Sequence, residues 1–187
     1  MNTEYLKSNL NCIIDGPLII NASLFKDQRG FFMENWNLKE FNKLIKKEIT
    51  FVQDNYSESE KGVIRGMHYQ VEPYNQDKLI RCVDGKIYDV IVDIRKDSKT
   101  FGQWSGYYLD SKSCNQLWIP YGFAHGFLVV SSKASVIYKT TKYWSQSHER
   151  SIRWNDPEFN IKWPLKGQKP ILSEKDSKAY KADDYYI

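Results

Sequence analysis

The chain has 187 residues, which is enough for one domain with a sizeable core. Its 13 tyrosines, 9 phenylalanines and 6 tryptophans argue against intrinsic disorder. The net charge of +4 is spread over interleaved acidic and basic residues. This balance favours anionic ligands only mildly and does not indicate a nucleic-acid surface.

Nothing in the pattern indicates a leader or a membrane span. The first twenty residues lack a basic start and a long apolar stretch, which argues against a signal peptide. No apolar run reaches membrane-spanning length. The cysteines at 12, 82 and 114 are odd in number and lack metal-like spacing, which fits reduced thiols. We therefore expect a cytoplasmic protein without membrane or nucleic-acid partners.

In chain order, one helix is predicted over 37–47, because Asn37 can cap it, Glu40 occupies the capping-box position and an apolar stripe follows. Segments rich in β-branched and aromatic residues then predict strands at 78–83, 86–94, 102–109, 116–120, 126–130 and 135–144. Turn signals at 84–85, 96–98 and 110–111 separate them. The polar tail after Pro164 is expected on the surface. We predict a single antiparallel all-β domain over residues 1–187, a jelly roll or small barrel with few helices.

Polar residues stand inside apolar and aromatic surroundings in three segments. They are the stretch 53–55, Arg65 with His68, and His125. Buried polar groups need a reason, yet each of these could be an ordinary hydrogen-bonded structural residue. Strand alternation places Tyr138 on one face with Val136, and Gly66 is able to form a bulge that re-aims Arg65. Composition and spacing alone leave the function open.

A catalytic metal is not expected. Many jelly rolls bind one, but the three histidines at 68, 125 and 148 contain no His-x-His pair. Likewise, no glycine-rich pattern resembles a phosphate-binding loop.

Linked motifs resemble the dTDP-4-dehydrorhamnose 3,5-epimerase family. They run in collinear order from about residue 12 to 177 and include FKDQRGFFME (25–34), FVQDN (51–55), VIRGMHYQ (63–70), KLIR (78–81), QLWIPYGFAHGF (116–127), YKTT (138–141), HER (148–150) and LSEKD (172–176). The resemblance implies a cupin-type jelly roll, a homodimer and a reaction that needs neither metal nor organic cofactor.

The resemblance also assigns roles by motif. It implies that His68 is the general base, Asp176 its partner and Tyr138 the acid on the other side of the sugar ring. Lys78 and His125 are implied as contacts to the ketosugar. The other substrate-binding positions are implied at Phe25, Arg29, Glu34, Gln53, Asn55, Arg65, Tyr143, Glu149 and Lys175. Some of the nucleotide-base contacts are implied to reach across the dimer.

These residue types suit the implied substrate, a nucleotide-linked 4-keto-6-deoxyhexose. Its C4 carbonyl acidifies the protons at C3 and C5, so the enolate forms without an external electron sink. Histidine, with a reference pKa of about 6.5, is largely neutral near pH 7 and can accept a proton. Tyrosine, with a reference pKa of about 10, starts protonated and can return one to the opposite face.

Several alternatives stay open. Some relatives invert only C3 or only C5, or act on other nucleotides or keto-heptoses, with the same His, Asp and Tyr. A jelly-roll sugar-nucleotide ketoisomerase would share the early enolisation. A non-catalytic sugar-binding module or a metal-dependent cupin belongs to another class altogether. The expected reaction is inversion at C3 and C5 of dTDP-4-dehydro-6-deoxy-glucose.

Overall fold

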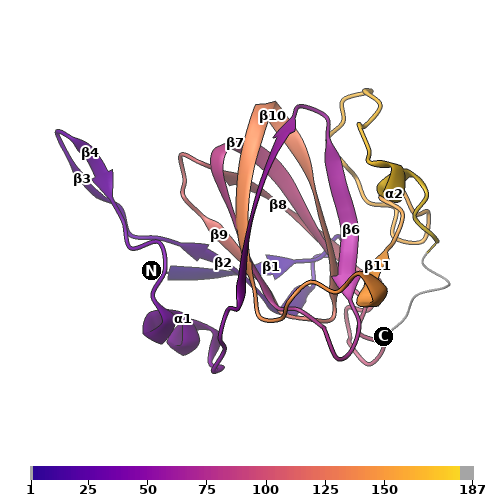
Figure 1. The fold of residues 1–187 in the computed structure, drawn as a ribbon, viewed down its shortest axis with the longest axis horizontal. Helices are drawn as coiled ribbons and strands as arrows, with labels where there is room; N and C mark the ends of the chain where they lie inside the picture. Colours follow the sequence, from indigo (N-terminus) through magenta and orange to yellow (C-terminus); the bar gives the residue numbers. More distant parts are fainter. Residues whose placement is uncertain (1, 182–187) are drawn as a thin grey trace.

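The protein is an antiparallel jelly roll in the computed structural model, which describes residues 2–181 (Figure 1). The strands are β1 (Asn2–Lys7), β2 (Ile13–Asn21), β3 (Phe25–Asp27), β4 (Gly30–Phe32), β5 (Gln53–Glu60), β6 (Ile64–Gln70), β7 (Lys78–Asp93), β8 (Trp104–Asp110), β9 (Gln116–Ile119), β10 (Phe123–Thr140) and β11 (Glu149–Ser151). The helices are α1 (Leu38–Ile45), a 3-10 turn η1 (Gln146–His148) and α2 (Glu174–Ser177). The predicted all-β fold with few short helices is confirmed.

Two long strands belong to both layers of the jelly roll. The first part of β7 pairs with β9 and its second part pairs with β8. Along its other edge, β7 pairs with β10 in antiparallel orientation. The first part of β10 pairs with β6, and its second part pairs with β5. One layer is therefore β1-β2-β9-β7-β10-β5 and the other is β8-β7-β10-β6-β11. The space between β5 and β6 opens where these layers diverge.

The turn predicted at Asp84-Gly85 is wrong, because β7 runs through it as one strand. Gly85 has φ of 75°, and a Cβ there would lie 2.1 Å from the carbonyl oxygen of Lys133 on the neighbouring β10. Opposite it, the register between β7 and β10 shifts between Val129 and Ala134. The Asp84-Gly85 pair therefore marks an irregularity in the pairing of β7 with β10, and the chain does not reverse its direction there.

The predicted helix is confirmed, with α1 beginning after Asn37, whose side chain accepts a hydrogen bond of 3.2 Å from the backbone N–H of Glu40. Phe41 anchors the helix by packing against Trp118 and Phe51. Replacing a buried phenylalanine by alanine typically costs about 3–5 kcal/mol, so this one side chain holds α1 against the first layer.

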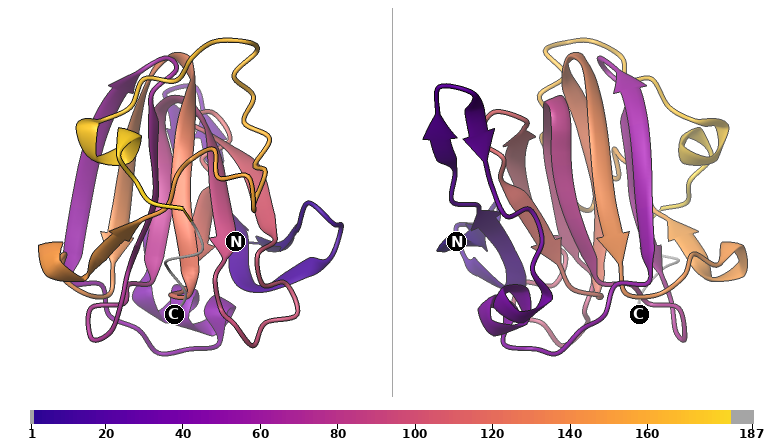
Figure 2. Two further views of the ribbon diagram at one scale, coloured as in Figure 1. Left: turned by 90° about the vertical axis from the view of Figure 1, so that its right-hand side faces the viewer. Right: turned by 60° about the vertical axis from the view of Figure 1, so that its left-hand side comes forward.

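The hairpin β3–β4 projects away from both layers, and the chain after β11 lies on the opposite side of the molecule (Figures 1 and 2). That later segment is tied back to the barrel by parallel bridges Val63↔Ile171 and Ile152↔Tyr180. We call residues 171–180 the C-terminal strap. The prediction that the tail lies on the surface holds for most of it, but Asp176 is buried.

Candidate active site

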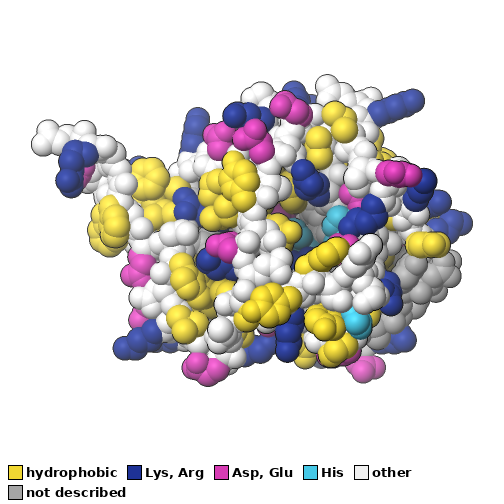
Figure 3. Space-filling view, in the orientation of Figure 1, with side chains coloured by type: hydrophobic (Ala, Val, Ile, Leu, Met, Phe, Trp, Pro, Cys, Tyr) yellow, Lys and Arg dark blue, Asp and Glu magenta, His cyan; other side chains and the backbone are white. Residues whose placement is uncertain are grey.

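A cavity of about 410 Å³ opens between the two layers, beside the C-terminal strap. Figure 3 shows histidine and Lys or Arg side chains gathered around a hollow on this face. The apolar floor comes from the main core, through residues such as Ile80, Phe127 and Val136. The polar and titratable lining residues are Ser57, Arg65, His68, Gln70, Gln76, Lys78, His125, Tyr138, Glu149, Ser173, Lys175 and Asp176. Because an apolar floor lowers the local dielectric constant, it strengthens electrostatic contacts between the polar lining residues and a bound ligand.

His68 on β6 forms a close pair with Asp176, with Nε2 at 2.6 Å from Oδ1. Burial lowers the pKa of His68 most strongly, and the neighbouring Asp176 raises it in part. Although burial opposes it, the pKa of Asp176 is lowered by hydrogen bonds from His68, Ser173 and a backbone N–H. The pair therefore holds a neutral imidazole beside an ionised carboxylate.

The strap positions Asp176 from far along the chain. Ser173 caps α2 and accepts a hydrogen bond of 3.1 Å from the Asp176 N–H. Ile171 exchanges backbone hydrogen bonds with Gly62 and Ile64 at the start of β6. Lys175 forms an ion pair of 2.9 Å with Glu149 on β11, across the rim of the cavity. These three contacts hold the strap in place, so that the Asp176 carboxylate lies against His68 on β6.

A second histidine–carboxylate pair lies beside the first. His125 on β10 faces the cavity, and its Nε2 lies 2.9 and 3.0 Å from the two carboxylate oxygens of Asp89 on β7. The Asp89 side chain is fully buried. Burial raises its pKa, while His125 and Lys78 act in the other direction. Sequence reasoning missed Asp89, although a carboxylate inside the apolar segment 86–94 was a readable signal.

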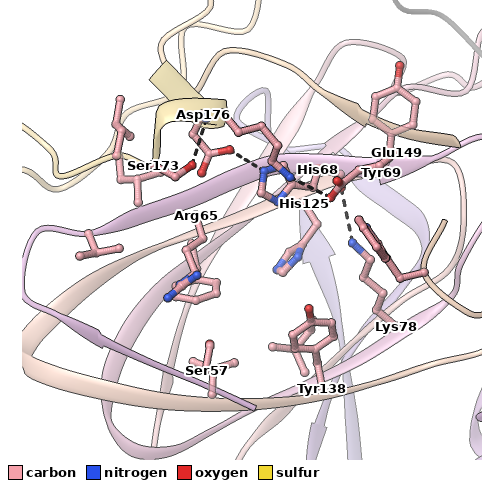
Figure 4. A pocket seen from close by; sticks show the side chains of 18 of the residues that line it. Ser57, Arg65, His68, Tyr69, Lys78, His125, Tyr138, Glu149, Ser173 and Asp176 are labelled. Carbon is pink, nitrogen blue, oxygen red and sulfur yellow. Dashed lines mark hydrogen bonds and ion pairs between the residues drawn. The ribbon is translucent and has the colours of Figure 1, made fainter. Parts of the chain in front are cut away.

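Lys78, at the start of β7, points its ammonium group into the same cavity (Figure 4), with Nζ 3.5 Å from the backbone oxygen of His68. Burial lowers its pKa to about 8, and the nearby carboxylates of Glu149 and Asp89 partly offset this. At neutral pH the lysine is therefore mostly charged and available to an oxyanion.

Tyr138 on β10 lies on the other side of the cavity from His68, as Figure 4 shows. Burial raises the pKa of its phenol, and the charge of Glu149 raises it further, whereas Arg65 lowers it. The predicted shared face of Val136 and Tyr138 is confirmed, since both line the cavity. The phenol is thus kept protonated opposite a neutral imidazole.

Eight of the predicted site residues come together here: His68, Tyr138, Asp176, Arg65, Lys78, His125, Glu149 and Lys175. Gln53 and Asn55 lie next to the cavity on β5 and are bonded to each other at 2.8 Å. Tyr143 is 64% exposed and does not line the cavity. Its neighbour Trp144 does, held by its N–H to the Gln53 side chain at 2.9 Å.

Phe25, Arg29 and Glu34 lie apart from the cavity of their own chain, on or just after the β3–β4 hairpin. All three are exposed. Arg29 is paired with Asp27 at 2.6 Å, and Phe25 packs only loosely on Phe32, with ring centroids 6.4 Å apart. Within one chain, these residues and the cavity form two separate groups.

Sequence reasoning also missed Ser57, whose Oγ is buried without a hydrogen-bond partner among the described residues. It lines the cavity on β5, two positions after Asn55, so strand alternation places it on the same face. Within residues 2–181 no group of three or more His, Cys, Asp or Glu side chains could hold a metal ion. Over the same range, no helix is long and apolar enough to cross a membrane.

Fold and cavity together define a jelly-roll protein whose cavity carries a histidine–carboxylate pair on one wall and a tyrosine phenol on the opposite wall. A family model described as dTDP-4-dehydrorhamnose 3,5-epimerase matches residues 11–184. The chain belongs to this epimerase family and is an isomerase. The resemblance inferred from the motifs is therefore confirmed.

The chain is similar to several members of this family. It is 52% identical over 176 residues to the dTDP-4-dehydrorhamnose 3,5-epimerase of Shigella flexneri, covering 93% of this chain and 96% of that protein. A Legionella pneumophila 3,5-epimerase, solved with dTDP-4-keto-L-rhamnose, is 42% identical with a TM-score of 0.89, covering 97% and 94% of the two chains. A 3′-monoepimerase of Streptomyces bikiniensis, solved with dTDP-quinovose, is 29% identical with a TM-score of 0.84, covering 90% and 84%.

Proposed function

We propose that this protein, working as one domain, inverts C3 and C5 of dTDP-4-dehydro-6-deoxy-glucose to give dTDP-4-dehydro-rhamnose. The observation that carries the proposal is the placement of His68 and Tyr138 on opposite sides of one cavity (Figure 4). Inversion needs a proton removed from one face of the sugar and another delivered to the opposite face. The bound dTDP-keto-rhamnose of the Legionella relative supports the substrate class.

His68 serves as the base. Because a carboxylate accepts hydrogen bonds, Nε2–H donates to Asp176 and the lone pair of Nδ1 is left to accept the substrate proton. Proton removal turns the imidazole into an imidazolium, which the ionised Asp176 stabilises. The C–H bond breaks, and its electron pair delocalises onto the C4 carbonyl oxygen as an enolate.

Lys78 stabilises that enolate oxygen with its ammonium group, and His125 lies beside it as a second polar contact. Removing one such preorganised contact typically costs about 3 kcal/mol of transition-state stabilisation. Tyr138 then donates its phenol proton to the same carbon from the other side. Exchange of both groups with solvent resets them before the second carbon reacts.

The nucleotide half needs different contacts. Arg65, at the open side of the cavity, suits the pyrophosphate because a guanidinium binds phosphate oxygens bidentately. Trp144 lines the cavity, so it joins Tyr143 as a candidate to stack on the base. Gln53, Asn55, Glu149 and Lys175 complete this end as polar contacts.

The protein is proposed to act as a homodimer. Phe25, Arg29 and Glu34 would then reach the cavity of the partner, which accounts for exposed aromatic rings on a projecting hairpin (Figure 1). A cytoplasmic location stays a prediction.

The test is solvent-deuterium incorporation during turnover of dTDP-4-dehydro-6-deoxy-glucose, followed at each carbon. The expected result is label at both C3 and C5, with a dTDP-rhamnose product after a coupled reductase. Label at C3 alone would replace the proposal with C3-only epimerisation, which the structural likeness to a 3′-monoepimerase makes the second candidate. The GDP-linked sugar is the control for the nucleotide, and faster turnover of it would contradict the dTDP assignment.

A further inference from the structure

Gly66 on β6 and Gly126 on β10 touch each other between residues that line the base side of the cavity. A Cβ on Gly66 would lie 2.5 Å from the Gly126 Cα and 2.8 Å from the His125 backbone oxygen. A Cβ on Gly126 would lie 2.8 Å from both the Arg65 backbone oxygen and the Met67 sulfur. These distances are shorter than real Cβ contacts, so the strands approach this closely only because neither residue has a side chain.

The close contact coincides with a β-bulge. His125 pairs with His68 and Phe127 pairs with Arg65, so β6 advances three residues while β10 advances two. Side chains alternate along a regular strand, and residues three apart would face opposite sides. The extra residue in β6 turns both Arg65 and His68 toward the cavity. Met67, between them, points into the second core cluster and is fully buried.

The bulge also contacts the partner of the base. The backbone N–H of Gly66 lies close enough to the Asp176 carboxylate to lower its pKa. Gly66 has φ of 128°, a conformation that favours glycine. The same two residues, 66 and 67, therefore set the direction of His68, hold its carboxylate and fix the spacing to His125.

We propose that Gly66 and Gly126 are positioning residues for the base: their contact sets the bulge that places His68 against Asp176 and opposite His125. This inference rests on the proposed role of His68. Gly126 is the sharper probe, since its backbone lies outside the positive-φ region and a methyl group there acts through contact alone. Apart from Arg65, the nucleotide end of the cavity, around Gln53 and Trp144, comes from other strands and loops.

The experiment is Gly126→Ala, with kcat, KM and the pH profile measured by proton exchange on the dTDP-linked ketosugar. Misplacing a reacting group by about 1 Å costs roughly 100-fold in rate, so kcat is expected to fall about that much. KM and dTDP binding by calorimetry are expected to change much less than kcat, because only Arg65 among the proposed nucleotide contacts lies in the bulge. The acid limb of the profile is expected to move to lower pH, since Asp176 raises the pKa of His68 and its contact loosens.

Two variants separate positioning from loss of stability. Ile20→Ala opens a cavity in the third core cluster, which contains no cavity-lining residue, and it is expected to lower the melting temperature with kcat unchanged. Met67→Ala added to Gly126→Ala is expected not to restore kcat, because the clash with the Arg65 backbone oxygen remains. Restored kcat in that double variant would overturn the proposal.

Normal kcat in Gly126→Ala beside an inactive His68→Ala would also overturn it, while leaving the proposed function intact. Full activity in His68→Ala would instead refute the proposed function. If Gly126→Ala is unfolded at the assay temperature, the His68 pKa is measured by NMR in the cold with dTDP present, because a ligand stabilises the folded state. A His68 pKa equal to that of the parent protein would then contradict the proposal.

Discussion

His68 and His125 face each other across neighbouring strands, and each is bonded to a carboxylate, but the two pairs are built differently. Asp176 arrives on the C-terminal strap and bonds one histidine at 2.6 Å. Asp89 belongs to the central strand β7 and bonds the other through both oxygens, at 2.9 and 3.0 Å. The first histidine keeps a 24% exposed side chain, whereas the second is more deeply enclosed.

Under the proposed mechanism, the pair of His68 and Asp176 cycles protons, whereas the pair of His125 and Asp89 holds a charge in place. Asp176 has three hydrogen-bond donors that keep its pKa low, so it can stabilise a newly formed imidazolium. Burial raises the pKa of Asp89, and the neighbouring His125 and Lys78 partly offset this rise. The negative charge of Asp89, like that of Glu149, raises the pKa of Lys78 and favours its protonated form.

The largest expected effect is that of His68→Ala, about 10⁴-fold on kcat, because general-base catalysis contributes up to that factor. His125→Ala removes only a polar contact and is expected to cost roughly 100-fold. Deuterium exchange at C3 and C5 measures both. Equal losses of kcat in His68→Ala and His125→Ala would contradict the different roles proposed for the two histidine–carboxylate pairs.

Tyr138→Phe is expected to lower turnover by about 10³-fold, since the acid on the opposite wall is lost while the ring is kept. Exchange-in without inversion is the expected product pattern, and dTDP binding is expected to be unchanged. Tyr56→Phe is the matched control, because this tyrosine faces outward and its hydroxyl bonds Ser135 at 2.9 Å. A comparable loss in Tyr56→Phe would show that the assay reports stability.

Lys78→Met is expected to reduce kcat/KM by roughly 10²-fold or more, as for other oxyanion contacts. The parent enzyme should show a bell-shaped pH profile. Activity is lost as pH falls through the pKa of His68, which lies below 6.5, because the base becomes protonated. It is also lost as pH rises through about 8, because Lys78 becomes neutral.

The alkaline limb near pH 8 should disappear in Lys78→Met. Lys86→Met, which removes a lysine outside this cavity, is the control and should keep both limbs. An alkaline limb retained in Lys78→Met would assign that limb to another group.

The smallest effects are expected when the carboxylates are exchanged for amides. Asp176→Asn should lower kcat by about 100-fold and move the acid limb to lower pH, because Asp176 raises the pKa of His68. Asp89→Asn should leave the acid limb in place and move the alkaline limb to lower pH, because Asp89 raises the pKa of Lys78. Asp54→Asn, on the exposed outer face of β5, should move neither. If the same limb of the pH profile moved in both Asp176→Asn and Asp89→Asn, the two histidine–carboxylate pairs would titrate as one coupled group, which would contradict the division between them.

Local sequence signals predicted much of the fold. The cap at Asn37 and the stripe after it depend on neighbours in the chain, so α1 was predicted closely. The glycine at 85 was misread because its close approach to Lys133 depends on a strand far away in the sequence. The bulge at Gly66 was anticipated from glycine chemistry, but its contact with Gly126 needs the strand pairing.

The site was predictable to the extent that it lies in strands or linked motifs. Strand alternation explains Tyr138, whereas motif resemblance was needed for Asp176, 108 residues from His68. Trp144 was not predicted as a cavity-lining residue because this stretch is a loop, where alternation does not apply. The path of this loop is set by long-range hydrogen bonds between the backbone of residues 143–145 and the side chains of Gln53 and Gln70. The hairpin residues lie apart from the cavity of their own chain, so their proposed role in a partner's cavity rests on motif resemblance alone.

The strap has a consequence for the life of the enzyme in the cell. At roughly 5–20 residues per second, a ribosome adds Asp176 several seconds after His68. All eleven strands within residues 2–181 precede α2 and Asp176 in the chain, so their residues are added before the carboxylate that bonds His68. Under the proposed mechanism, the base therefore gains its carboxylate only after the chain has been extended to the strap.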